Sequence, residues 1–337
     1  MSPHRFCVAP MLDVSDRHFR YFARQLTRGA RLYSEMITTG ALLHGPRDRL
    51  LAFDVAEHPV ALQLGGSEPD DLARAARLAG AAGYDEINLN CGCPSPRVQR
   101  GAFGACLMRE PELVADCVRA MRDAVSVPVT VKHRIGVDRV ASYEFVRDFV
   151  GTVSEAGCEV FVVHARNAWL DGLSPKENRT VPPLRPDVVA QLARDFPTLS
   201  FVVNGGLRTH EESLAQLAQV DGVMIGREAC ENPWMLAAVD PLYFDRPAPC
   251  LARDDAIDAM RPYLRRQIDA GEAPRAIVRH MLGLFNGLPG ARAWRRTLSD
   301  PAALERHGAD VLDAARDALT RAATRRDERD ERTARLP

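Results

Sequence analysis

Two short apolar runs, Glu86-Ile-Asn-Leu-Asn90 and Val127-Pro-Val-Thr-Val-Lys-His133, flank a helix-spaced segment at Pro111–Val125. A strand, a helix and a second strand in this order are typical of a βαβ unit with parallel strands. The same alternation continues in both directions along the chain. The complete set of predicted strands is Phe6–Ala9, Leu32–Ser34, Val60–Leu64, Glu86–Asn90, Val127–His133, Val160–His164, Phe201–Asn204 and Gly222–Ile225.

Segments with helical apolar spacing separate these strands. Ser67-Glu-Pro-Asp70 offers a cap and an acidic first turn to one of them, and Gly83 suits its C-terminal end. Eight strands in unbroken alternation with helices predict a parallel (β/α)8 (TIM) barrel. A doubly wound open sheet is the alternative, but it has no equally natural use for eight strands in this order. The predicted helices are Arg17–Leu26, Asp70–Ala82, Pro111–Val125, Ala141–Ala156, Pro186–Asp195 and Glu211–Gln219.

The pattern changes after Trp234. Pro241, Pro247 and Pro249 indicate a linker, and no convincing strand follows them. We therefore expect a barrel over residues 1–240 and a small all-helical domain over residues 241–337, whose charged tail frays from about residue 325. The helices predicted in this domain are Arg253–Ala270, Ala273–Phe285, Ala291–Leu298 and Pro301–Ala323.

Composition indicates an ordinary soluble protein of the cytoplasm. Hydrophobic residues make up 46% and charged residues 26% of the 337 residues, which is usual for a globular chain. No apolar run approaches the roughly 20 residues that span a bilayer, and the N-terminus lacks the apolar stretch of a secretory signal. The eight cysteines show neither a disulfide framework nor the paired spacing of a zinc site. We expect a reduced protein with no structural metal.

Charge is distributed unevenly although the net charge is −1. The window Arg261–Asp300 holds eight arginines against three acidic residues, and lysine is absent after Lys176. A basic face on a neutral protein is the pattern expected where a protein meets phosphates. A solvated helix face is the alternative explanation, and charge alone does not separate the two.

Two glycine turns follow the seventh and eighth predicted strands. They are Asn204-Gly205-Gly206 and Gly226-Arg227. In (β/α)8 barrels the active site lies at the carboxyl ends of the strands, and these two loops frequently build a phosphate site from backbone N–H groups. Glycine permits a close approach of the backbone, and Arg227 can add a charge-assisted hydrogen bond. The sequence therefore predicts a phosphate-bearing ligand.

Three further polar residues stand at or near strand ends. Lys132 can stabilise negative charge on a reduced flavin ring, Gln63 can bind the pyrimidine edge of such a ring, and His164 lies nearby. With the two glycine turns, this set fits FMN better than a simple sugar phosphate. No Gly-x-Gly-x-x-Gly pattern follows the first strand, which argues against a Rossmann-type site.

Cys93 lies in the turn Cys91-Gly92-Cys93-Pro94-Ser95 after the fourth strand. A turn held by glycine and proline keeps its side chains in place, and a thiol can protonate a carbanion-like carbon. Metal binding by Cys-x-Cys is less well supported because no second ligand pair completes a site. A buried structural cysteine suits Cys91 better than Cys93. The following segment, Gly101-Ala-Phe-Gly-Ala-Cys106, is expected to be a mobile lid.

The segment Asn90-Cys-Gly-Cys-Pro-Ser-Pro-Arg-Val-Gln-Arg-Gly-Ala-Phe-Gly-Ala-Cys-Leu-Met108 closely resembles the signature of tRNA-dihydrouridine synthases. Matching segments run nearly end to end, including Val8–Asp13, Glu57–Gly66, Val131–Gly136 and Gly222–Arg227. Gly172–Leu184 and Gly290–Ser299 resemble the bacterial A subfamily in particular. The sequence departs from the family pattern at Cys91, where an apolar residue is usual, and at Asn167, where lysine is usual.

This resemblance implies reduction of uridine to 5,6-dihydrouridine at positions 20 and 20a of the tRNA D-loop. FMN would be the cofactor and NADPH, or NADH, the reductant; hydride would pass from FMN to C6 and a proton from Cys93 to C5. The residues that would hold FMN are Pro10, Met11, Leu12, Gln63, Lys132, His164, Asn204, Gly205, Gly206, Gly226 and Arg227. The residues that would contact tRNA are Asn90, Lys176, Arg179, Arg292 and Arg295.

Two other functions would require part of the same residues. An FMN barrel acting on a free pyrimidine would share the phosphate loops and Lys132, but it would need neither the arginine-rich tail nor the Lys176–Arg179 segment. A tRNA-binding protein without catalysis would not need Cys93, Lys132 or His164. The expected protein is a monomer that binds the elbow region of tRNA and no membrane.

Overall fold

The computed structural model describes residues 2–140 and 142–334. The chain forms two compact units. The first extends to Arg17 and resumes over Gly29–Gly226, whereas the second holds His18–Arg28 and the chain from Arg227 onward. Within the described residues, no helix is both long enough and apolar enough to cross a bilayer.

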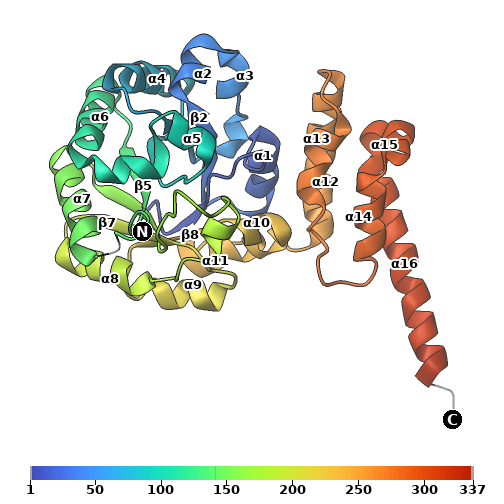
Figure 1. Cartoon of the computed structure of the whole chain (residues 1–337). Helices are drawn as coiled ribbons and strands as arrows, with labels where there is room; N and C mark the ends of the chain where they lie inside the picture. Colours follow the sequence, from blue (N-terminus) through green and yellow to red (C-terminus); the bar gives the residue numbers. More distant parts are fainter. Residues whose placement is uncertain (1, 141, 335–337) are drawn as a thin grey trace. The chain divides into compact units, whose positions relative to one another are not determined.

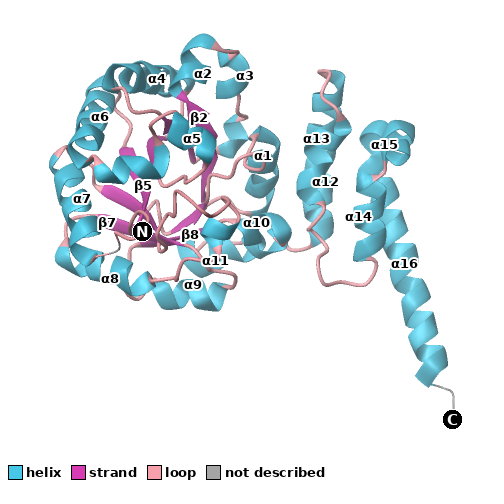
Figure 2. Ribbon diagram, in the orientation of Figure 1, coloured by secondary structure: helices cyan, strands magenta, loops and turns pink. Residues whose placement is uncertain are grey.

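The first unit is a closed barrel in which β1 to β8 follow one another in chain order, with every neighbouring pair parallel. The helices surround a ring of strands in Figure 2. This arrangement confirms the predicted TIM barrel and all eight predicted strands. The strands are β1 (Phe6–Val8), β2 (Arg31–Thr38), β3 (Val60–Gly65), β4 (Glu86–Cys91), β5 (Val129–Arg134), β6 (Val160–His164), β7 (Ser200–Asn204) and β8 (Gly222–Ile225).

The second strand is longer than its sequence predicts. A prediction that ends at Ser34 follows the apolar run, but β2 continues to Thr38. A register shift between Tyr33 and Met36 lets the strand pair with β3 again as far as Gly65. The bulge keeps both strands in the barrel although polar residues interrupt the local pattern.

Helices cover the outside of the barrel (Figure 1). The predicted helix from Ala141 begins at Tyr143, because the Ser142 hydroxyl accepts a hydrogen bond from Phe145 N at 3.3 Å and caps it; Ala141 lies outside the described residues. The helices of this unit are α2 (Thr39–His44), α3 (Arg47–Leu51), α4 (Pro69–Ala82), α5 (Pro96–Arg100), α6 (Pro111–Ala124), α7 (Tyr143–Glu155), α8 (Pro186–Asp195) and α9 (His210–Gln216), with short 3-10 turns η1 (Val55–Glu57), η2 (Gly104–Arg109) and η3 (Glu177–Arg179).

Alternation along each strand sends every second side chain into the barrel. Seven buried interior side chains form one cluster, which draws on six of the eight strands and on the residue after β1: Cys7, Ala9, Tyr33, Ala61, Val162, Val202 and Met224. The intervening residues face the helices and are almost all apolar, such as Leu62, Leu89 and Val131. Side chains therefore fill the barrel, and a ligand can reach its interior residues only from the ends.

The second unit is helical, as predicted. Trp294 is fully buried and donates from Nε1 to Met281 O at 2.9 Å, and Tyr21 stacks on Tyr263 with ring centroids 3.8 Å apart. Its helices are α1 (Arg17–Leu26, whose first residue belongs to the first unit), α10 (Arg227–Glu231), α11 (Val239–Phe244), α12 (Arg253–Asp269), α13 (Pro274–Val278), α14 (Ala291–Ser299), α15 (Pro301–His307) and α16 (Val311–Ala334), with η4 (Pro233–Ala238), η5 (Arg279–Met281) and η6 (Gly308–Asp310).

Some local predictions in this unit were wrong. Pro241 lies inside α11 rather than in a linker, since a proline in the first turn of a helix costs no hydrogen bond. The single helix predicted over Pro301–Ala323 is divided at Gly308, which has φ 52°, into α15 and α16. Helix α16 extends to Ala334, and the fraying expected from about residue 325 stays a prediction.

Candidate active site at the barrel mouth

Five of the predicted site residues lie on five consecutive strands at the carboxyl end of the barrel. Gln63, Asn90, Lys132, His164 and Asn204 come from β3 to β7 in that order. Gln63 Oε1 accepts from Asn90 Nδ2 at 2.8 Å, and Lys132 Nζ donates to Asn204 Oδ1 at 3.0 Å. Residues more than 140 positions apart in sequence thus meet at one rim, because parallel strands end on the same side.

The Cys93 turn is held at four backbone atoms. Asn90 Oδ1 accepts from the N–H groups of Gly92 and Cys93, each at 3.0 Å. Arg134 Nε donates to Gly92 O at 3.1 Å, and Ala105 N donates to Cys93 O at 2.9 Å. These bonds restrict the turn without using the Cys93 thiol, which is partly exposed.

The segment Gly101–Cys106, which we predicted to be a mobile lid, packs in part against this turn. Phe103, Gly104 and Ala105 are buried and Gly104–Cys106 belong to the turn η2, whereas Gly101 and Ala102 are exposed. Gly104 has φ 79°, and a Cβ added there would stand 2.6 Å from Cys93 O. The glycines therefore permit close packing against the Cys93 turn, where the sequence suggested mobility.

Arg134 is a residue that the sequence prediction missed. It is buried at the end of β5, and Nη1 donates to Asn167 O at 3.2 Å and to Asn178 O at 2.9 Å. One guanidinium thus ties the Cys93 turn to the loop between β6 and α8. The available signal was its place in Lys132-His-Arg134 at a strand end, where we considered only the lysine.

The mouth is strongly cationic. Burial, together with the charge of Arg134, lowers the pKa of Lys132 to about 7, and the Cys93 side chain acts in the opposite direction. Burial and the charges of Arg134 and Lys132 hold the pKa of His164 well below its ordinary value. Among the described residues, the hydrogen-bond partner of Lys132 is the Asn204 amide rather than a carboxylate. Such a site favours an anionic ligand, which would restore the charged lysine.

The glycine turn after β7 has backbone angles that favour glycine. Gly205 has φ 109° and Gly206 has φ 76°, a region that side-chain-bearing residues rarely adopt. A Cβ on Gly205 would stand 2.7 Å from His164 Cδ2. Next to it, Asn204 Nδ2 donates to Met224 O at 2.8 Å, which joins the ends of β7 and β8.

The remaining predicted cofactor residues lie beside the barrel end or follow it directly. Gly226 ends the first unit, and a Cβ there would stand 3.6 Å from Met11 Sδ. Met11 packs against the interior cluster, whereas Leu12 is 68% exposed; Pro10 stands between β1 and Met11. Arg227 begins α10 in the second unit.

The residues predicted to bind tRNA occur in both units. Lys176 and Arg179 flank buried Asn178 in the loop before α8, where Asn178 Nδ2 donates to Trp169 O at 2.8 Å. Arg292 and Arg295 lie on α14 in the second unit, with Arg292 exposed. Asn90, in contrast, is buried and hydrogen-bonded to the Cys93 turn.

The arginine-rich window is less basic than its sequence suggests. Arg261 pairs with Asp258 and Asp313, and Arg265 pairs with Asp310 at 3.1 Å. These three aspartates lie outside the window in sequence, and they neutralise both arginines. On α14, Arg292, Arg295 and Arg296 form no ion pair with any described residue. Within this window, α14 therefore carries three arginines that form no ion pair with a described residue, and α13 carries one, Arg275.

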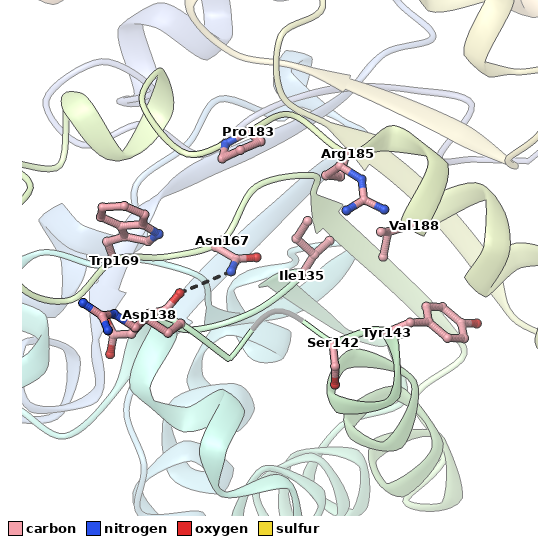
Figure 3. A pocket seen from close by; sticks show the side chains of 10 residues that line it. Ile135, Asp138, Ser142, Tyr143, Asn167, Trp169, Pro183, Arg185 and Val188 are labelled. Carbon is pink, nitrogen blue, oxygen red and sulfur yellow. Dashed lines mark hydrogen bonds between the residues drawn. The ribbon is translucent and has the colours of Figure 1, made fainter.

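A separate cavity of about 340 Å³ opens between the loops that follow β5 and β6 (Figure 3). Asn167 Nδ2 donates to Asp138 O at 3.3 Å on its wall, beside Trp169 and Arg185. None of the residues predicted to bind the cofactor or tRNA lines it.

Cys91 and Cys93 differ sharply although they are two residues apart. Cys91 is fully buried at the end of β4, and burial raises the pKa of its thiol well above the ordinary value. Cys93 is partly exposed in the turn at the mouth. Of the two residues, Cys93 is therefore the one with exposed surface.

Comparison with known proteins shows the family of the chain. The tRNA-dihydrouridine(20/20a) synthase of Yersinia pestis is 57% identical over 312 residues, covering 92% of this chain and 90% of that protein. The enzymes of the same name from Pseudomonas syringae pv. tomato and Escherichia coli K12 are 60% and 59% identical, covering 88% and 91% of this chain and 88% of each relative. The model of the dihydrouridine synthase (Dus) family matches residues 7–323. The chain therefore belongs to the dihydrouridine synthase family of enzymes.

Proposed function

We propose that this protein reduces uridine to 5,6-dihydrouridine at positions 20 and 20a in the D-loop of tRNA. The names of relatives with 57–60% identity over nearly the whole chain support this substrate. The observation that carries the chemistry is the placement of Cys93, partly exposed in a turn held by Asn90 and Arg134 at a cationic barrel mouth.

FMN is the cofactor that fits the residues of the mouth. Lys132 is buried at the mouth with an amide partner, where an anion could bind. The turn at Gly205 and Gly206 has positive φ values that favour glycine, and it packs against the side chains of His164 and Leu184. Gln63 would bind the pyrimidine edge of the ring. The residues proposed to hold FMN are Pro10, Met11, Leu12, Gln63, Lys132, His164, Asn204, Gly205, Gly206, Gly226 and Arg227.

FMN, reduced by NADPH, supplies the hydride for C6 of the uracil when it is bound. The chain itself provides the proton: the Cys93 thiol donates it to C5, so that one hydride and one proton saturate the double bond. Lys132 and Arg134 stabilise negative charge that develops near the base during this step. The bonds to the backbone of the Cys93 turn keep the thiol in place without consuming its proton.

The target uridine must leave its stack to reach a site inside the mouth. We propose that Lys176, Arg179, Arg292 and Arg295 contact the phosphates of the tRNA, because they are cations on a loop at the mouth and on α14. Asn90 was expected to contact tRNA as well. Its acceptor atom is already used by Gly92 and Cys93, so its remaining capacity is an amide N–H. We propose a cytoplasmic enzyme that acts as a monomer.

The test is mass spectrometry of D-loop fragments from an unmodified tRNA transcript after incubation with the protein and NADPH. We expect the mass of two hydrogen atoms to be added at positions 20 and 20a. Cys93→Ala should lower this rate by about 10²–10⁴-fold, the usual contribution of a general acid. Cys106→Ala is the matched control, since Cys106 is also a partly exposed cysteine, and its thiol donates to Phe103 O.

An unchanged rate for Cys93→Ala would exclude Cys93 as the donor. A yellow protein that oxidises NADPH but leaves tRNA unmodified would indicate an enzyme for free pyrimidines. A colourless protein that binds tRNA without modifying it would indicate a binding protein.

A further inference from the structure

The interior of the barrel contains a polar strip below the mouth. Glu86, Asn88 and Asn90 alternate along β4 and therefore point to the same side, into the barrel. In the strand register, Asn88 lies between Gln63 of β3 and Thr130 of β5. All five side chains are at most 8% exposed. Buried polar groups of this kind are costly unless each has a hydrogen-bond partner.

The lower end of the strip is a buried carboxylate. Glu86 Oε2 lies 2.6 Å from His4 Nε2 and 3.4 Å from Arg31 Nη1. Glu86 Oε1 accepts from Tyr33 Oη at 2.8 Å and from Thr130 Oγ1 at 2.6 Å. Burial alone would raise the pKa of Glu86, but the His4 hydrogen bond, the charges of His4 and Arg31 and the Thr130 hydrogen bond lower it overall. Glu86 is therefore an ionised group that accepts hydrogen bonds and donates none.

This accepting end sets the direction of every bond above it. Because Thr130 gives its only proton to Glu86, its oxygen accepts from Asn88 Nδ2 at 2.8 Å. Asn88 Oδ1 then faces Gln63 and accepts from Gln63 Nε2 at 2.7 Å. Gln63 Oε1 in turn accepts from Asn90 Nδ2 at 2.8 Å. Three amides that are symmetric in shape are thereby given one orientation.

The upper end of the strip is the Cys93 turn. With Nδ2 committed to Gln63, Asn90 presents Oδ1 to the N–H groups of Gly92 and Cys93. A reversed Asn90 amide would place donors against donors at this point. The chain of hydrogen bonds thus has an acceptor at its lower end and two donors at its upper end, and both ends require the same direction.

We propose that Glu86, acting through Thr130 and Asn88, is the positioning residue that orients the amides of Gln63 and Asn90 and so holds the Cys93 turn in place. Glu86, Thr130 and Asn88 act at a distance and touch neither the base nor the cofactor. The proposal deepens the proposed function, because it connects the floor of the barrel to the proton donor. Its structural part stands independently of which substrate the enzyme uses.

The test breaks the chain at Thr130. Thr130→Val removes the hydroxyl group and keeps the shape, whereas Thr130→Ser keeps the hydroxyl. Thr27→Val is a matched control, because Thr27 is also buried and also donates to a carboxylate, Asp240 Oδ1, at 2.6 Å. Thr27 belongs to the second unit, so that its loss should destabilise the protein without touching the strip.

Hydrogen–deuterium exchange of the peptide that contains Gly92 and Cys93 is the first measurement, made without cofactor or tRNA. We expect the two amides to exchange about five-fold faster in Thr130→Val, as loss of about one hydrogen bond implies. Thr130→Ser and Thr27→Val should match the wild type at this peptide. If Thr130→Val does not fold, Asn88→Leu, which is similar in volume, breaks the same chain and should give the same result.

Turnover is the second measurement. With tRNA as substrate, Thr130→Val should lower kcat by about ten-fold or more with little change in KM, since a displaced proton donor slows the reaction and not binding. Equal exchange in wild type and Thr130→Val, or the same increase in Thr27→Val, would overturn the proposal. If kcat falls as far in Thr130→Ser as in Thr130→Val, then the effect comes from packing and not from the hydroxyl group, and the proposal is overturned as well. An altered exchange rate in a protein that does not modify tRNA would reject the proposed function and leave the positioning role intact.

Discussion

The two sides of the barrel interior differ in kind although one closed sheet encloses both. On β3 to β5 the inward residues at and below the mouth include Gln63, Glu86, Asn88 and Thr130, which are buried and polar. On β6 to β8 the corresponding layer is Val162, Val202 and Met224, which belong to the apolar cluster. Apolar contacts stabilise without direction, whereas hydrogen bonds between buried groups permit only one arrangement. The comparison indicates that the apolar side, on β6 to β8, mainly stabilises the barrel. The polar side, on β3 to β5, mainly fixes the positions of hydrogen-bonded side chains.

The largest loss of stability is expected when the polar side loses the negative charge of Glu86. Glu86→Gln leaves Arg31 buried without its carboxylate, and breaking a buried pair in this way typically costs about 3–5 kcal/mol of unfolding free energy. Urea unfolding followed by circular dichroism measures the loss. The exposed Glu305→Gln is the control and should change stability by less than about 0.5 kcal/mol. A loss below about 1 kcal/mol for Glu86→Gln would mean that the strip is not anchored by this charge.

A smaller loss is expected on the apolar side. Val162→Ala removes two buried methyl groups and should lower the free energy of unfolding by about 1–3 kcal/mol. The folded fraction should form dihydrouridine at the wild-type rate, because no hydrogen bond to the Cys93 turn is lost. Stability and single-turnover rate are measured on the same sample. A fall in rate comparable to that of Thr130→Val would remove the distinction between the two sides.

At the mouth, where the two sides meet, Lys132 should make stability depend on pH. Its pKa falls from an ordinary 10.5 to about 7 in the folded protein, so between these values the unfolded chain binds more protons. Stability of the cofactor-free protein should therefore rise with pH over this window, by up to about 1.4 kcal/mol per pH unit from this group. Lys132→Met should flatten the slope.

Urea unfolding at pH 7.5 and pH 9.5 compares the two proteins. Lys176→Met is the matched control, since Lys176 is exposed and its loss should leave the slope unchanged. If Lys132→Met keeps the full wild-type slope, then the pKa of Lys132 is not lowered in the folded protein, and another group causes the pH dependence.

The smallest effect on the barrel is expected from changes outside it. Arg292→Gln should leave stability and the rate at saturating tRNA unchanged, and it should reduce the dependence of tRNA affinity on salt by about one charge. Arg265→Gln is the comparison, because Asp310 already pairs with that arginine. Binding measured at several salt concentrations should separate the two. Equal effects would show that ion pairing does not select which arginines meet the phosphates.

Much of the site was predictable because it follows from local pattern. Strand alternation placed Gln63, Lys132 and His164 at strand ends, and a barrel brings such ends together. The role of Arg134 was missed because its partners, Gly92, Asn167 and Asn178, lie on other loops. The close packing of Gly104 against the Cys93 turn was not predicted, because glycine permits motion and close packing alike, and only its neighbours decide between them.

The sequence by itself determined the eight-fold alternation, the helical C-terminal region and the residue types at the strand ends. These depend on residues that are neighbours along the chain, where a period of two or of 3.6 can be read directly. Only the tertiary structure decided which partner each polar group takes. Glu86 and Thr130 meet, and Arg261 meets Asp313, because barrel closure and helix packing set distances between residues far apart in sequence. A hydrogen bond depends on those distances to within a few tenths of an ångström, and no pattern of residue types encodes them.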